Sequence, residues 1–152
     1  MTGHTEMLVW ARENNCPWNK WTCFMAAAEG HLEVLQYARR HGCPWDEKTL
    51  IKAAARGHLE VLSWAVEAGC KADEDVCAAA ADAGQLAALK LLRELEVPWN
   101  AVTVLRAAQR GHDKLLRWAA DNGCPLDDES LFHAKTTCSL RTLNLLYETF
   151  KR

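Results

Sequence analysis

Apolar residues recur along the chain at the spacing of an α-helix, and the pattern itself returns every 27 residues. The segment GHLEVLQYARRHGCPW at 30–45 comes back as GHLEVLSWAVEAGC at 57–70. In the second copy, Leu59, Leu62 and Val66 fall on one helix face. No window shows the alternation of apolar and polar residues that is typical of a strand. The pattern therefore predicts an all-α chain built from a repeated unit.

Three series of equivalent residues mark the repeat. Glycine stands at positions 3, 30, 57, 84 and 111, and a short polar residue stands at 19, 46, 73, 100 and 127. The turn between units carries a small apolar residue, mostly followed by proline: Cys16, Cys43, Cys70, Val97 and Cys124. We therefore predict a single domain, 1–152, that divides into a half repeat (1–15), four repeats (16–42, 43–69, 70–96 and 97–123) and a degenerate last repeat (124–152).

Each unit is predicted to hold two short helices. In the unit 43–69, Asp46 caps a helix that runs through KTLIKAAAR and ends at Gly57, and a second helix runs from His58 to Gly69. Helices shorter than about 12 residues are marginal in water, so stacking must stabilise them. One column of equivalent positions holds large side chains suited to stacking: Trp10, Tyr37, Trp64, Leu91, Trp118 and Leu145. The predicted fold is an α-solenoid.

The stretch TLIKAAARGHLEVL at 49–62 resembles the ankyrin repeat, whose units read TPLHxAAxxGHLExV. Alanine pairs at 26/27, 53/54, 80/81 and 107/108 align with this pattern, as do the Gly-His pairs. An ankyrin unit has about 33 residues, and the difference falls between Asp46 and Thr49, where the family has its β-hairpin finger. The chain therefore looks like a short, fingerless ankyrin variety with CPW/D turns. The resemblance implies stacked helix-turn-helix units that form a binding scaffold, with no catalytic role and no cofactor.

Composition limits the number of domains, the cellular location and the kinds of partner that we expect. The chain has 152 residues, 49% hydrophobic and 25% charged, as in one compact soluble domain. No apolar run approaches the roughly 18 residues of a membrane span, and MTGHTEM lacks the features of a signal peptide. Seven cysteines without such a signal favour a reducing, intracellular location, the cytoplasm first and the nucleus as an alternative. A net charge of −2 gives no overall field for nucleic acid or acidic membranes.

Two residue types that often carry chemistry are better explained by the repeat. The turn cysteines occupy the same place in successive units, and helices stacked about 8–10 Å apart keep them too distant for a disulfide or a shared metal. We expect small buried residues there, and also at Cys23 and Cys77. The histidines at 4, 31, 58 and 112 share one turn position, where Gln85 replaces them in one unit, and are expected to be structural. Without a phosphate loop, a GxSxG turn or an HExxH motif, we predict no enzyme.

Recognition residues are expected where the units differ. On the first helix of each unit, positions about four residues apart form a stripe that would face the inner, concave side of an ankyrin-like stack. Trp21 stands out because no other unit has an aromatic residue at the equivalent position. One alternative is that the basic residues merely keep the surface solvated, and another is that Trp21 packs on Pro17 and Trp18. The predicted partner-binding residues are Trp21, Met25, Lys48, Lys52, Arg56, Asp75, Arg106, Arg110 and His133.

The turn tryptophans at 18, 45 and 99 are expected to pack rather than to bind. Ala72 stands in their place in the unit 70–96, and the loss of a large ring predicts an altered curvature or a groove there.

The favoured function is a non-catalytic protein–protein interaction scaffold that binds a partner through the stripe. Reversing Lys48, Lys52 and Arg56 to Glu is then expected to abolish partner capture. One alternative is a single-strand RNA reader with one unit per base, which the net charge and Asp75 disfavour. Another is self-assembly through uncapped ends, because the chain opens with a second helix whose Leu8 would be exposed. No membrane partner is predicted.

Overall fold

The computed structural model describes residues 18–150, together with residues 6, 9, 10 and 13. The predicted half repeat over 1–15 lies outside the described residues, apart from those four positions, and so do Gly3, His4, Leu8 and Cys16.

All regular structure in the described part of the chain is helical, which confirms the all-α prediction. The helices are α2 (Lys20–Ala28), α3 (Leu32–Arg40), α4 (Glu47–Arg56), α5 (Leu59–Glu67), α6 (Glu74–Asp82), α7 (Leu86–Glu94), α8 (Ala101–Arg110), α9 (Asp113–Asp121), α10 (Asp128–Thr137) and α11 (Leu140–Phe150).

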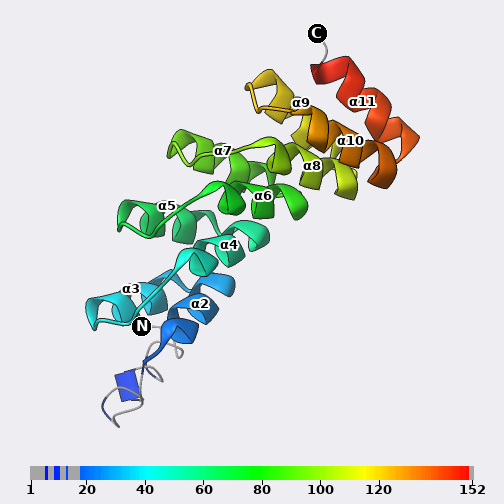
Figure 1. Cartoon of the computed structure of the whole chain (residues 1–152). Helices are drawn as coiled ribbons and strands as arrows, with labels where there is room; N and C mark the ends of the chain where they lie inside the picture. The colour runs from blue at the N-terminus through cyan, green and yellow to red at the C-terminus, as the bar shows by residue number, and fades with distance from the viewer. Residues whose placement is uncertain (1–5, 7–8, 11–12, 14–17, 151–152) are drawn as a thin grey trace.

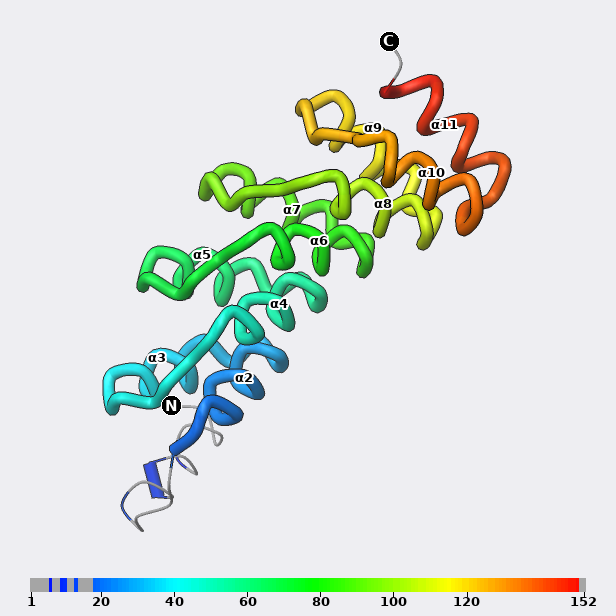
Figure 2. The backbone as a smooth tube through the Cα atoms, in the orientation of Figure 1, coloured from blue at the N-terminus to red at the C-terminus, as the bar shows by residue number. Residues whose placement is uncertain are grey.

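These helices stack in two rows (Figure 1). The inner row consists of α2, α4, α6, α8 and α10, and the outer row consists of α3, α5, α7, α9 and α11. Successive helices of the inner row contact one another more extensively than those of the outer row. The stack bends, with the inner row on the inside of the curve (Figure 2). The predicted α-solenoid of stacked helix pairs is therefore confirmed.

A side-chain cap opens every inner-row helix, as the series of short polar residues predicts. These caps are Asn19, Asp46, Asp73, Asn100 and Asp127. In the first four, a side-chain oxygen accepts a hydrogen bond of 3.0 to 3.2 Å from the backbone N–H two residues on. The carboxylate of Asp127 accepts from the N–H of Ser130 at 2.7 Å, and this bond holds the pKa of its carboxyl below the usual range.

The turn after α4 shows how one helix ends and the next begins. Gly57 ends α4 in the left-handed conformation, with φ of 73°. The backbone of His58 is not helical, but its carbonyl already accepts from the N–H of Leu62 at 3.0 Å. His58 is therefore the N-cap position, and α5 begins one residue later than predicted. It also ends at Glu67, before the predicted Gly69.

The turn tryptophans pack against outer-row rings, which confirms their predicted role. Each pair is tilted or edge to face, an arrangement that aromatic rings prefer over face-to-face stacking. The pairs are Trp18–Tyr37, Trp45–Trp64 and Trp99–Trp118, with centroids 5.9, 5.7 and 5.8 Å apart.

The repeated cysteines join neighbouring units. The buried thiols of Cys43, Cys70 and Cys124 lie 3.3, 3.5 and 3.6 Å from the carbonyl oxygen of the cap residue one unit earlier. Cys23 and Cys77 are fully buried in the inner row. All five thiols are free, so the prediction of small buried residues is confirmed at these positions.

Two of the repeated histidines, His58 and His112, have a structural role, because their rings contact the preceding unit. The Nε2 atom of His58 lies 2.9 Å from the carbonyl of Ala28, and that of His112 lies 3.0 Å from the carbonyl of Asp82. Each ring covers the glycine of the preceding unit, Gly30 or Gly84, so closely that a Cβ atom there would meet it. Gln85 covers Gly57 in the same way.

Candidate functional site

The predicted stripe lies on the solvent side of the inner row. All nine predicted partner-binding residues are exposed, and they come from all five inner-row helices. Between them, Ala79 is half-buried and Val102 is exposed. The stripe therefore follows the inner row from α2 to α10, the row that lies on the inside of the bend (Figure 1).

An aromatic cluster occupies the α2 end of the stripe. Trp21 and Met25 are 60% and 51% exposed. The ring of Phe24 meets Trp21 edge to face, with the centroids 5.1 Å apart. Trp18 contacts Tyr37 on the outer row, and Pro17, the other residue on which Trp21 could pack, lies outside the described residues. Sequence analysis did not single out Phe24, although its spacing of three residues from Trp21 places both on one helix face.

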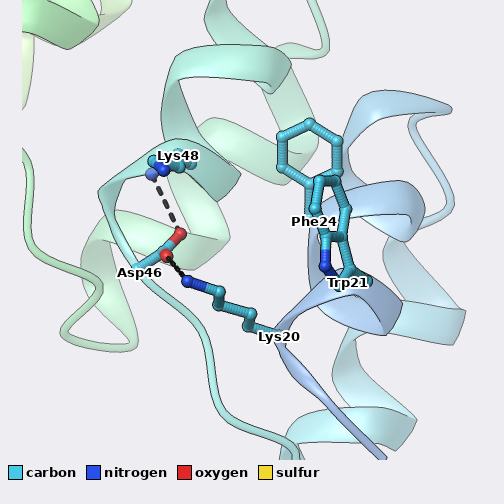
Figure 3. A pocket seen from close by; sticks show the side chains of 5 residues that line it. All are labelled: Lys20, Trp21, Phe24, Asp46 and Lys48. Carbon is cyan, nitrogen blue, oxygen red and sulfur yellow. Dashed lines mark hydrogen bonds and ion pairs between the residues drawn. The ribbon is translucent and has the colours of Figure 1, made fainter.

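Two lysines of α4 stand beside these rings. The ammonium of Lys52 lies 5.9 Å from the centroid of the Phe24 ring, within the range of a cation–π contact. Lys48 lines a small hollow of about 60 Å³, together with Lys20, Trp21, Phe24 and Asp46 (Figure 3). We name Trp21, Phe24, Lys48 and Lys52 the aromatic corner.

The charge of Asp46 in this hollow is already engaged. Its carboxylate accepts from the backbone N–H of Lys48 at 3.2 Å and pairs with the ammonium of Lys20 at 3.6 Å (Figure 3). The cations of Lys48 and Lys52 have no ion-pair partner within the described part of the chain. The corner therefore combines an apolar surface with an excess of positive charge.

Arg56, the third basic residue predicted on α4, is different because it is neutralised across the interface with α2. Its Nη1 atom lies 2.7 Å from the carboxylate of Glu29 and 3.1 Å from the carbonyl of Ala28. The predicted basic triplet therefore consists of two unpaired lysines and one paired arginine.

The same pairing recurs two units later. The guanidinium of Arg110 binds both carboxylate oxygens of Asp82, at 3.1 and 3.2 Å. Such a two-point contact fixes the orientation of both side chains. Because adjacent inner-row helices lie in register, the last turn of one helix meets the last turn of the next, and a cation there can reach an anion one unit earlier.

The remaining predicted residues lie apart from the aromatic corner. Asp75 is on α6 and Arg106 is on α8, and neither forms an ion pair with another described residue. His133 is on α10, where its ring meets Phe132 edge to face at 6.4 Å. The stripe thus alternates in charge along the stack and has no unbroken basic row.

Metal-binding groups and reactive thiols were the two kinds of chemical site weighed from the sequence. No three of their His, Cys, Asp or Glu side chains are grouped so as to hold a metal ion. Burial raises the pKa of the Cys70, Cys77 and Cys124 thiols to about 12 and also raises that of Cys23. These thiols are therefore protonated at neutral pH and poor nucleophiles. None of the described helices has the length and apolar character needed to cross a membrane.

Two further hollows lie on the outer row. One, of about 440 Å³, runs between α5 and α7 along Leu59, Ala87 and Leu91. Ala72 does not line it, so this hollow is not the groove predicted from the missing tryptophan ring. The other, of about 470 Å³, lies between α9 and α11 beside Leu140.

Comparison with known proteins identifies the repeat. Residues 23–66, which run from α2 to the last turn of α5, match the family model described as ankyrin repeats (many copies). Curated proteins gave no significant match. Ankyrin repeats are generally protein–protein interaction modules, and the family is typically non-enzymatic. The match covers the helix pairs α2–α3 and α4–α5, and stacked helix pairs of the same kind continue through α11, so this part of the chain is similar to ankyrin repeats.

Proposed function

We infer that this protein is a non-catalytic scaffold that binds a protein partner on the exposed stripe of the inner row. The observation that carries the proposal is the exposure of Trp21 and Met25 on that stripe. Large apolar side chains are normally buried, and tryptophan is among the residues that contribute most to binding at protein interfaces. The stripe is also where the units differ, whereas the caps, glycines and turn residues that build the stack repeat.

Two other features support an intracellular location and a protein partner rather than RNA. The free, buried thiols are suited to a reducing intracellular compartment, so we place the protein in the cytoplasm or nucleus. RNA is a poorer candidate than protein, because Arg56 and Arg110 already bind carboxylates and Asp75 separates the remaining cations.

The test is partner capture with a charge reversal confined to Lys48 and Lys52. Arg56 should be kept, because Glu at that position would face Glu29 and disturb the α2–α4 interface. Glutamate at position 48, in the first turn of α4, is compatible with the helix dipole, and glutamate at the exposed position 52 is a good helix former, so the helical circular dichroism signal should not change. The double variant Lys48→Glu/Lys52→Glu is expected to lose a protein that the wild type captures from a lysate of the source organism.

The matched control is Lys71→Glu/Lys114→Glu, which makes the same change in net charge at exposed positions off the stripe. It should capture the same proteins as the wild type. Identical capture by all three proteins would contradict binding on the stripe. Loss of capture after nuclease treatment would point to RNA, and a mass well above that of a monomer in light scattering would point to self-association.

A further inference from the structure

We propose that the aromatic corner binds an acidic segment of the partner protein, with its carboxylates on Lys48 and Lys52 and a neighbouring apolar side chain on Trp21 and Phe24. This proposal rests on the proposed function and names the chemistry that one part of the stripe recognises.

The register between α2 and α4 shows that α2 offers no acidic side chain to Lys48 and Lys52. On the other side of α4, Asp75 of α6 is equivalent to Lys48, but no ion pair joins the two among the described residues. Position 56 on α4 is equivalent to position 29 on α2, and there Arg56 finds Glu29 at 2.7 Å. One and two turns earlier, Lys52 and Lys48 are equivalent to Met25 and Trp21, which offer no anion. The same interface therefore neutralises one of three cations and leaves two beside apolar side chains.

The two lysines also repel each other. They stand four residues apart on one helix face, where like charges are destabilising. A carboxylate placed between them would relieve this repulsion and gain two charge-assisted hydrogen bonds. Because an exposed ion pair alone contributes little, the binding energy must come largely from the apolar side chain that covers Trp21.

The shape of the corner agrees with such a segment. The hollow of about 60 Å³ beside Lys48 has room for a small polar group rather than for an aromatic ring. Trp21 lines the hollow and is 60% exposed, and Met25, which does not line it, is 51% exposed, so these side chains can cover a larger apolar group. An acidic residue next to a leucine or phenylalanine would satisfy both parts.

A long nucleic acid fits less well than an acidic peptide. It would need cations to continue along the stripe, but Asp75 follows on α6 and Arg110 is held by Asp82. The separate pair of lysines beside an apolar surface is better matched by a short protein segment.

The test uses fluorescein-labelled peptides of roughly 12 residues in which Asp or Glu alternates with Leu or Phe. Two matched peptides replace the acidic residues by Asn and Gln, or the apolar residues by Ser. We expect the acidic apolar peptide to bind in fluorescence anisotropy, and each matched peptide to bind at least about tenfold more weakly. Binding should weaken as salt is raised, because charges are screened.

Three variants locate the binding. Trp21→Ala and Lys48→Gln/Lys52→Gln should each weaken the acidic apolar peptide about tenfold. Lys71→Gln/Lys114→Gln, which removes two exposed cations off the stripe, should leave it unchanged. Equal binding of all three peptides, equal binding to all variants, or tighter binding of a poly(U) oligonucleotide would overturn the proposal.

Partner capture separates this proposal from the proposed function. If Arg106→Glu abolishes capture while Trp21→Ala and Lys48→Gln/Lys52→Gln retain it, the aromatic corner is not the contact and the stripe still is. If no stripe variant changes capture, the proposed function itself fails.

Discussion

At the residue scale, repeated histidine and cysteine side chains join a unit to backbone groups of the preceding unit. His112 illustrates this, because its ring lies over Gly84 and its Nε2 atom is 3.0 Å from the carbonyl of Asp82. Gly84 is needed both for its φ of +69° and because a Cβ atom there would lie 2.7 Å from the imidazole. Gly111 has a similar φ of +71° but no atom within 4 Å of a Cβ.

Gly84 and Gly111 should therefore differ in how much stability the protein loses when each is replaced by alanine. Gly111→Ala introduces only left-handed strain and should destabilise the protein by about 1 kcal/mol. Gly84→Ala introduces the same strain and also displaces the His112 ring. The free energy of unfolding in urea should therefore fall by about 1 kcal/mol more for Gly84→Ala than for Gly111→Ala. In a His112→Ala background the two substitutions should cost the same. Equal losses in the wild-type background would show that the ring contributes nothing to the interface.

Sequence analysis missed one kind of contact between single residues, the stacking of an arginine on a turn tryptophan. The guanidinium groups of Arg39 and Arg93 lie 4.2 and 4.7 Å from the ring centroids of Trp45 and Trp99. The sequence carries a signal for this, because arginine stands six residues before a turn tryptophan in both cases. Where the turn has Ala72 instead, position 66 holds valine. Comparing the units pairwise, rather than column by column, would have revealed the contact.

At the scale of elements, the helices were the most predictable part of the fold. The caps and the glycine that ends α4 act within a few residues of their own backbone, so local sequence is enough to place them. The ion pair between Arg56 and Glu29 joins different helices. Predicting it requires the register between α2 and α4, and reading each helix alone gave a basic triplet instead.

The last helix pair lacks an inter-unit contact that earlier units have. Ser139 stands where His112 stands one unit earlier, so no side chain covers Gly111. Contacts between α8 and α10 are also fewer than those between α6 and α8. In a solenoid each unit is stabilised only by its neighbours. We therefore expect amides of α10 and α11 to exchange with solvent faster than those of α4 to α8 in hydrogen exchange measurements.

Acidic pH should increase the difference in hydrogen-exchange protection between α10 and the helices α4 to α8. The folded-state pKa of Asp127, the cap of α10, is lowered by its hydrogen bond from the Ser130 N–H. Its contribution to stability is present above the unfolded-state pKa and is lost as pH falls through the folded-state pKa. Protection of α10 should therefore fall toward acidic pH, and Asp127→Asn should reduce that dependence. Uniform protection from α4 to α11 at every pH would refute the expectation.

At the scale of the whole molecule, stacking turns five short helix faces into one surface. Sequence analysis predicted the residues of that surface from their spacing on single helices. It could not predict the aromatic corner, because Phe24 and Lys52 meet only when α2 and α4 are packed together. The functional claim concerns the surface as a whole, so its test must compare the two sides of the stack.

The most direct measurement is site-specific photo-crosslinking from each row. Val102 on the stripe and Leu59 on the outer row are each 38% exposed, so they form a matched pair for replacement by p-benzoylphenylalanine. After irradiation in a lysate of the source organism, we predict that a partner protein is linked to position 102 and not to position 59. Linkage of the same partner to position 59 alone, or equally to both positions, would contradict binding on the inner row.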